Sequence, residues 1–140
     1  MNKNNPLLDF EELPRFGAIR PEHVGSALDE LLVSNQAVIG QLENTVNDNA
    51  DWKSFAQPLE DLEDQLGKMW APVSHLNAVA DTEDLREAYQ SSLEKLTTYR
   101  AELGQNKTIF QGYRNIQEHA DFSSLDAAKR KVILLSLIHI

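Results

Sequence analysis

Apolar side chains recur along most of the chain at spacings of three, four or seven residues, the pattern of helices with one buried face. The first such run begins at Pro21, a residue favoured at the first helical position because its missing N–H costs nothing there. Its apolar positions are Val24, Leu28, Leu31, Val38, Leu42 and Val46. We therefore predict a long amphipathic helix from Pro21 to about Asn47, followed by a turn at Asp48, Asn49 and Ala50.

A second run of helical spacing contains a proline well inside the pattern. Its apolar positions are Phe55, Leu59, Leu62, Leu66, Met69, Val73 and Leu76. Pro58 suits a first helical turn, but Pro72 removes a backbone hydrogen bond and crowds the preceding turn. That costs about 3 kcal/mol unless it is compensated, so the sequence predicts a kink or a break near Ala71.

The third predicted helix has clear signals at both ends. Asp81 or Thr82 can cap its N-terminus, and Gly104 is a natural stop. The apolar stripe between them is Leu85, Tyr89, Leu93, Leu96, Tyr99 and Leu103.

Two shorter helices follow the glycine. One begins near Asn106 and carries Ile109, Phe110, Tyr113 and Ile116. The other begins at a Ser123 or Ser124 cap and directs Leu125, Ala128 and Val132 inward. Strand-like alternation occurs nowhere, so the sequence predicts an all-α fold of about five antiparallel amphipathic helices.

The two ends of the chain differ from this pattern. Residues 1–20 contain Pro6 and Pro14, which disfavour helix, and we expect an extended arm that packs on a larger body. The last nine residues have almost no polar face and are too few to span a membrane, which takes about 20. We divide the chain into an arm (1–20), a helical region (21–133) and a tail (134–140) that is either a truncated buried helix or non-native sequence.

Charge and composition exclude several classes of protein. The chain has 13 Lys and Arg against 22 Asp and Glu, a net charge of −9, which disfavours nucleic acids and anionic membranes as partners. It has no cysteine, and hence no disulfide and no thiolate metal site. The first twenty residues contain no apolar run of the secretory kind, so we expect a cytoplasmic location.

The histidines do not form a recognisable metal site. A zinc-protease helix presents two imidazoles four residues apart, with a glutamate between them to take a proton from the bound water. The chain has four histidines: His23, His75, His119 and His139. They are separated by 20 residues or more, so we interpret each as a packing or surface residue.

Other candidate groups also favour structural readings. Glu60, Asp61, Glu63 and Asp64 follow one another along a helix, as on a solvated face. Ser74 and His75 are adjacent in a helix and cannot face each other as nucleophile and base. Trp52 and Trp70 are interpreted as core anchors. We therefore predict no catalytic, cofactor-binding or metal-ligating residue in the chain.

Several motifs, in order, resemble one enzyme family. They are Asn5-Pro6-Leu7-Leu8, Leu13-Pro14 with Phe16, Pro21-Glu22-His23-Val24, Trp70-Ala71-Pro72-Val73-Ser74-His75-Leu76-Asn77, and Leu85-Arg86-Glu87-Ala88-Tyr89. Together they resemble the N-terminal region of the thimet-type oligopeptidases, over about residues 5–133. The Pro-Val-Ser-His-Leu-Asn and Leu-Arg-Glu-Ala-Tyr stretches are the more specific ones.

The resemblance implies part of a larger, two-lobed helical enzyme, a monomer that cleaves short peptides in the cytoplasm. It also implies zinc held by a His-Glu-x-x-His helix and a further glutamate in the C-terminal half of a longer chain. No such ligand maps onto this sequence, so we expect this segment to bind no zinc and to be inactive alone. Its expected partners are short peptides and the remainder of its own chain, with its helices forming part of a channel wall. The alternative is a free-standing acidic helical module that binds other proteins without catalysis.

Overall fold

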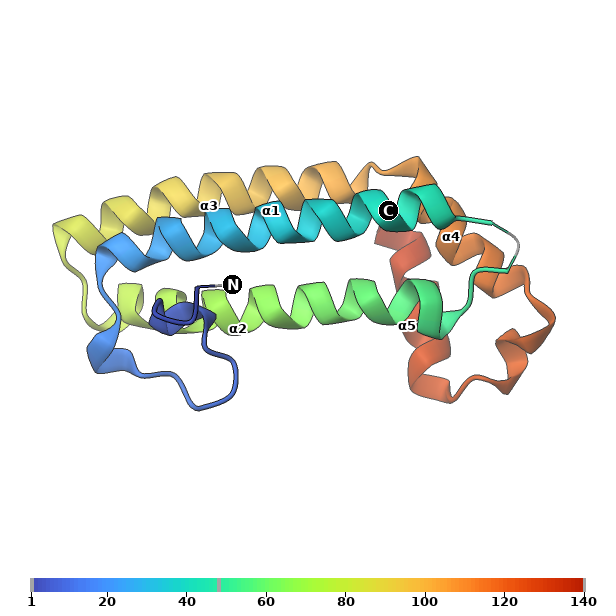
Figure 1. Ribbon diagram of the computed structural model, residues 1–140, viewed down its shortest axis with the longest axis horizontal. Coiled ribbons are helices and arrows are strands. Elements are labelled where there is room, and N and C mark those ends of the chain that lie inside the picture. Colours follow the sequence, from blue (N-terminus) through green and yellow to red (C-terminus); the bar gives the residue numbers. More distant parts are fainter. Residues whose placement is uncertain (1, 48, 140) are drawn as a thin grey trace. The chain divides into compact units, whose positions relative to one another are not determined.

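The computed structural model describes residues 2–47 and 49–139, and within them it contains only helices and connecting segments (Figure 1). Met1, Ile140 and Asp48, the first residue of the predicted turn, lie outside the described residues. The described α-helices are α1 (Pro21–Thr45), α2 (Gln57–Val79), α3 (Glu83–Gly104), α4 (Lys107–Glu118) and α5 (Ala127–His139). The shorter elements are the 3₁₀ turns η1 (Pro6–Leu8), η2 (Phe16–Ala18) and η4 (Ala120–Ser124), and the π-helical turn η3 (Trp52–Ala56). The predicted all-α class with five helices is confirmed.

The described residues fall into two compact units, and α1, α2 and α3 each contribute to both. The first unit contains residues 2–35 and 62–99. The second unit contains residues 36–61 and 100–139. The predicted boundaries at residues 20 and 133 stay predictions.

The first unit is built on parts of three long helices, with α1 and α3 running in one direction and α2 in the other (Figure 1). Its buried apolar side chains include Val24, Ala27, Leu28, Leu31, Leu66, Met69, Val73, Leu85, Leu96 and Tyr99. Most of them belong to the predicted stripes, so the periodicity identified the buried faces. On the surface, Lys95 Nζ lies 2.7 Å from Asp29 Oδ1 and joins α3 to α1.

Helix α2 passes through Pro72 without ending, so a break near Ala71 does not occur, and the alternative of a kink there stays a prediction. Pro72 is buried beside Val73, which is fully buried. Burial of apolar surface offsets the missing backbone hydrogen bond.

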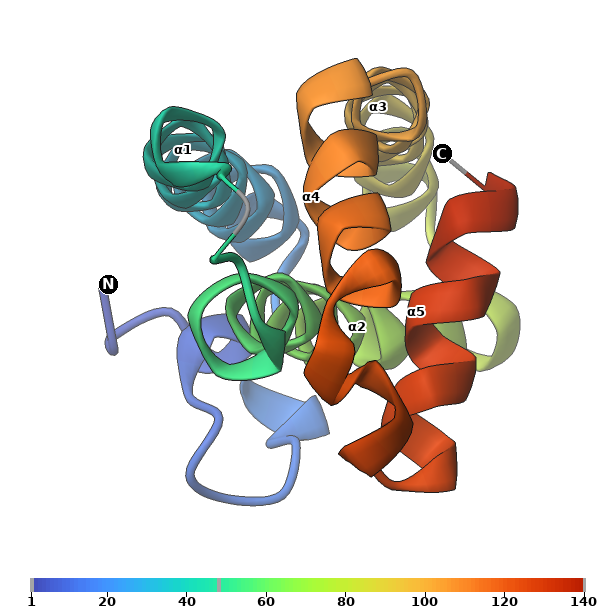
Figure 2. The ribbon, with the colours of Figure 1, turned by 90° about the vertical axis from the view of Figure 1, so that its right-hand side faces the viewer.

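In the second unit, α4 packs against α5 and against η3 (Figure 2). The rings of Phe55 and Tyr113 meet edge to face, with centroids 5.5 Å apart. Ile109, Ile116 and Ile133 are buried with them. This unit therefore has an apolar core of its own.

The predicted Thr82 cap of α3 is confirmed, and α4 begins next to Asn106, as the sequence predicted. The backbone N–H of Leu85 donates to Thr82 Oγ1 at 3.3 Å, and α3 begins one residue after the threonine. Asn106 Oδ1 accepts from the backbone N–H groups of Thr108 and Ile109 at 3.1 and 3.0 Å at the start of α4. The predicted end of α3 at Gly104 is also correct.

The last helix begins later than predicted. Ser123 and Ser124 belong to η4, and the first turn of α5 is capped by Asp126, whose Oδ1 accepts the Lys129 N–H at 2.9 Å. An aspartate makes a charge-assisted hydrogen bond of this kind, so α5 begins after Asp126 rather than at the predicted Ser123 or Ser124 cap. Ala128 is exposed, and Ile133 is the buried residue of this helix.

Smaller differences occur at other ends. Helix α1 ends at Thr45, so Val46 lies beyond it, and Phe55 lies in η3 rather than in α2. The arm is not extended throughout, because it contains η1 and η2. In the tail, Leu134, Leu135 and Ile138 are 43%, 44% and 73% exposed. None of the helices in the described part of the chain is long and apolar enough to cross a membrane.

Candidate functional site

The four histidines lie at separate places, and His23, His75 and His119 make local structural contacts. His23 Nδ1 accepts the backbone N–H of Arg20 at 2.9 Å and closes the first turn of α1. The His75 ring packs against Phe16, with centroids 5.5 Å apart. His119 Nδ1 accepts the Asp121 N–H at 3.1 Å at the start of η4, and His139 is the last residue of α5.

The resemblance implies zinc for the family, which raises the question whether the described residues include the ligand set that zinc requires. Across residues 2–47 and 49–139, no group of three or more His, Cys, Asp or Glu side chains could hold a metal ion. A zinc site needs at least three such protein ligands converging on one point. The expectation that this chain carries no catalytic, cofactor-binding or metal-ligating residue stays a prediction.

The other candidates from the sequence have ordinary surroundings. Asp61 accepts a hydrogen bond from Gln57 Nε2 at 2.9 Å, and Asp64 pairs with Lys68 at 2.6 Å, while Glu60 is half-buried and Glu63 exposed. Ser74 is half-buried next to the exposed His75.

The two tryptophans are half-buried rather than fully buried anchors. Trp70 stacks on Tyr89 with centroids 5.1 Å apart. Trp52 Nε1 donates to Gln57 Oε1 at 2.9 Å, and Lys129 Nζ lies 5.7 Å from the centre of the Trp52 ring. A cation over an indole face is a favourable contact, and this one joins α5 to η3.

One feature with the geometry of a binding site lies in the first unit, between the N-terminal arm and α2. The start of the arm is firmly anchored, because Leu7 and Leu8 are 3% exposed. Asn5 is buried too: its Oδ1 accepts the Leu7 N–H at 3.0 Å, and its Nδ2 donates to the His23 carbonyl at 3.0 Å. The next stretch of the arm leaves this anchor as a loop.

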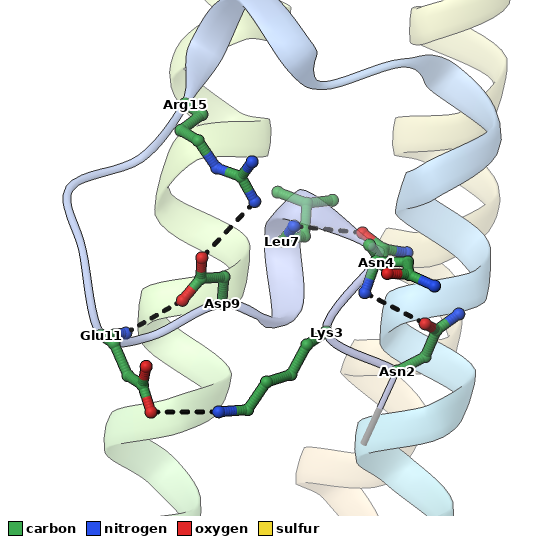
Figure 3. Close-up of polar contacts among 8 residues, drawn as sticks. Asn2, Lys3, Asn4, Leu7, Asp9, Glu11 and Arg15 are labelled. Carbon is green, nitrogen blue, oxygen red and sulfur yellow. Dashed lines mark hydrogen bonds and ion pairs between the residues drawn. The ribbon is translucent and has the colours of Figure 1, made fainter.

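Polar contacts hold that loop in shape (Figure 3). Lys3 Nζ lies 3.0 Å from Glu11 Oε1, and an Arg15 guanidinium nitrogen lies 3.4 Å from Asp9 Oδ2. The Glu11 N–H also donates to Asp9 Oδ1 at 3.3 Å. Because these pairs are exposed, each contributes about 0–1 kcal/mol, but together they restrict the loop.

Between the loop and α2 lies a cavity of about 500 Å³, which we call the arm pocket. Its apolar walls are Phe10, Leu13, Pro14, Phe16, Ala71 and Pro72. Its charged or titratable groups are Asp9, Glu12, Lys68 and His75. The sequence predicted that the arm packs on a larger body, but it did not predict this pocket. The available signals were the surplus of apolar residues in the arm and the proline within α2.

Pro72 also changes the hydrogen bonding along this wall. Proline has no backbone N–H, so the Lys68 carbonyl, four residues earlier, lacks its usual α-helical donor. Lys68, Ala71 and Pro72 all line the arm pocket. Helix α2 therefore leaves this backbone acceptor without its regular partner.

A smaller cavity of about 120 Å³ lies in the second unit. Trp52, Phe122, Asp51, Asp121 and His119 are among its lining residues. Asp51 is already used as a cap, and a backbone hydrogen bond from Ser54 lowers its pKa below the ordinary aspartate value. His119 is likewise engaged by the Asp121 N–H, so this cavity offers fewer free groups than the arm pocket.

Comparison with known proteins finds a family model and several relatives that match this chain. The model of the "Neurolysin/Thimet oligopeptidase, N-terminal domain" family matches residues 28–139. The chain belongs to this family. Oligopeptidase A of Haemophilus influenzae is 36% identical over 137 residues, which are 98% of this chain and 20% of the relative.

Two plant relatives extend the comparison. The probable cytosolic oligopeptidase A of Arabidopsis thaliana is 32% identical over 130 residues, covering 93% of this chain and 18% of the relative. The organellar oligopeptidase A of the same plant, described as chloroplastic/mitochondrial, is also 32% identical, covering 93% of this chain and 16% of the relative. The chain thus spans about a fifth of the length of the curated relatives it matches.

Only one of the two walls of the arm pocket lies within the residues that the family model matches. The α2 wall falls inside the region that the family model matches, whereas the arm precedes it. The Haemophilus match, which covers 98% of the chain, includes nearly the whole sequence.

Proposed function

We propose that this chain is the N-terminal helical part of a zinc metallo-oligopeptidase that hydrolyses short peptides in the cytoplasm. The observation that carries the proposal is the match of residues 28–139 to the N-terminal domain of an oligopeptidase family. The relatives are about five times longer than this chain. The zinc ligands and the general base would lie in the sequence that corresponds to their remaining four-fifths, and zinc there would activate the attacking water.

The role proposed for this segment is architectural. Within the first unit, the parts of α1, α2 and α3 that carry buried apolar side chains would supply a wall of packed helices. In the proposed enzyme this wall borders a channel whose narrowness admits short unstructured peptides and excludes folded proteins. Its main partner is then the remainder of the same polypeptide, in a protein that is monomeric overall.

A chimera tests both parts of this proposal. The segment of Haemophilus oligopeptidase A that aligns with this chain is replaced by the chain, and hydrolysis of a quenched fluorescent peptide is compared with digestion of a folded protein. We expect peptide hydrolysis that depends on added zinc, with no digestion of the folded protein. The control is the Haemophilus enzyme without the aligned segment, for which we expect loss of activity. Full activity and unchanged size selectivity of that deletion would contradict the architectural role.

A second candidate function is supported by the open arm pocket and the net charge of −9. On this alternative, the chain is a free-standing acidic helical module that binds other proteins without catalysis. Sequencing the parent gene beyond the codon for Ile133 separates the two. An in-frame His-Glu-x-x-His downstream supports the peptidase, and a stop codon after Ile140 supports the module. The same sequence tests the proposed non-native origin of residues 134–140.

A further inference from the structure

We propose that the arm pocket binds a short unstructured peptide by taking up one large apolar side chain next to a basic residue. The choice of a peptide rests on the proposed function, whereas the preferred side chains follow from the pocket itself. Its volume of about 500 Å³ falls within the range of roughly 300–1,000 Å³ typical of small-ligand sites. Because the pocket contains no catalytic group, it would bind the peptide without cleaving it.

The apolar walls favour a large hydrophobic side chain. Leu13 is 88% exposed and Phe16 is 43% exposed, although both belong to an arm whose first turn is buried. The Phe16 ring contacts the His75 ring, with centroids 5.5 Å apart, and both residues line the pocket. Covering these side chains with an apolar group removes their surface from water, which is the principal driving force for such binding.

The loop that carries Leu13 is largely formed before any ligand arrives. The ion pairs Lys3–Glu11 and Arg15–Asp9 hold the two ends of the loop (Figure 3). The 3₁₀ turn η2 then begins at Phe16. A preorganised loop loses little conformational freedom on binding, so more of the burial energy appears as affinity.

The charges around the pocket favour a basic neighbour in the ligand. Asp9 is paired with Arg15, and Lys68 is paired with Asp64. The Glu12 carboxylate, by contrast, has no hydrogen bond or ion pair to another residue in the described part of the chain. This unmatched carboxylate accepts hydrogen bonds and carries a negative charge, and the net charge of −9 attracts cations at longer range.

Binding is measured with the purified chain and a dye-labelled peptide in which one phenylalanine lies between two arginines. Fluorescence anisotropy gives the dissociation constant for the wild type and for Leu13→Ser and Glu12→Gln. Loss of one buried leucine is expected to weaken binding about tenfold. Removal of the carboxylate charge is expected to weaken it about threefold, and the Glu12 effect should vanish at high salt.

Matched controls are available on the same unit. Val33 is 69% exposed on α1 and does not line the pocket, so Val33→Ser repeats the leucine change elsewhere. Glu94 is exposed on α3, so Glu94→Gln repeats the charge change. Both controls should leave the affinity unchanged, and circular dichroism should show that all four variants keep the helical fold.

Several results would overturn the proposal. Equal effects of Leu13→Ser and Val33→Ser would show that binding is not at the pocket, as would equal affinity for a peptide with glutamates in place of the arginines. A dimer in sedimentation that Leu13→Ser dissociates would assign the pocket to a second copy of the chain. If the peptide does not bind the pocket but the chimera is active, the proposed oligopeptidase function stands and the pocket proposal fails. If the peptide binds and the chimera is inactive, the pocket proposal stands and the proposed function fails.

Discussion

The ring of Phe55 packs directly on Gly112, so η3 and α4 approach each other where α4 has no side chain. A β-carbon at position 112 would lie 2.5 Å from Phe55 Cε2 and 2.6 Å from Cε1. Carbon atoms in contact are normally about 3.5–4.0 Å apart. The glycine is therefore required by packing, although in a helix interior it costs about 0.5–1 kcal/mol relative to alanine.

Gly112→Ala is expected to lower the free energy of unfolding, because the new methyl group forces Phe55 out of place. Such overpacking costs roughly 1–3 kcal/mol and outweighs the gain in helix propensity. Gly67→Ala on α2 is the matched control, since a β-carbon there meets nothing within 4 Å. It should stabilise the protein by about 0.5–1 kcal/mol. Urea unfolding measures both, and a Gly112→Ala protein as stable as the Gly67→Ala protein would contradict the packing argument.

Asp51 fixes the start of η3 through a reciprocal pair of hydrogen bonds with Ser54. The Ser54 N–H donates to Asp51 Oδ1 at 2.7 Å, and the Asp51 N–H donates to Ser54 Oγ at 3.2 Å. Asp51→Ala should cost about 1 kcal/mol of unfolding free energy, whereas Asp51→Asn should keep most of the cap. Urea unfolding at neutral pH measures both.

The same cap has a pH dependence of known sign. The backbone hydrogen bond from Ser54 lowers the pKa of Asp51, so its contribution is present above the unfolded-state value of about 4. It is lost as the pH falls through the lower folded value. The difference in stability between wild type and Asp51→Asn should therefore shrink in acid, and a difference that stays constant with pH would count against the cap.

The sequence predicted the helices well because their signals are local. The apolar spacing within each helix, as at Leu28 and Leu31, identifies the buried face. Thr82 and Asn106 each start a helix by accepting backbone hydrogen bonds from residues two or three positions later. The start of α5 was mispredicted because Ser123, Ser124 and Asp126 are all competent caps, and the local pattern does not rank them.

The arm pocket and the course of α2 through Pro72 depend on contacts between distant segments. The cost of a proline inside a helix can be estimated from sequence, but its compensation requires knowing that Pro72 is buried. Likewise, the apolar residues of the arm indicate packing, yet only the fold brings Phe16 onto His75 and leaves a cavity beside them. Residue pairs with long sequence separation have no local signal.

Asn35 and Tyr99 form a polar contact inside the first unit. Asn35 is 1% exposed, its Nδ2 donates to the Tyr99 hydroxyl at 3.3 Å, and its Oδ1 has no partner within the described residues. Tyr99→Phe removes the acceptor, so we expect a loss of about 1–3 kcal/mol from the buried amide. The double variant Asn35→Leu with Tyr99→Phe should cost less than the sum of the single changes, because it leaves no amide to satisfy. Strict additivity in a urea double-mutant cycle would show that the two side chains are not coupled.

Tyr113 links the stability of the second unit to alkaline pH. Burial raises the pKa of its phenol to about 12, an effect opposed by a side-chain hydrogen bond with Ser136 and assisted by the nearby Glu60 carboxylate. The folded state therefore favours the neutral phenol. Its contribution is fully present below the unfolded-state pKa of about 10 and is lost as the pH rises towards 12.

Unfolding free energies measured between pH 9 and pH 12 should therefore fall by roughly 2–3 kcal/mol more for the wild type than for Tyr113→Phe. The phenylalanine variant keeps the edge-to-face contact with Phe55 but has no proton to lose. Lysine titration is common to both proteins and cancels in the comparison. Parallel curves for the two proteins would mean that water reaches the hydroxyl in the folded state, contrary to the burial of Tyr113, which is only 4% exposed.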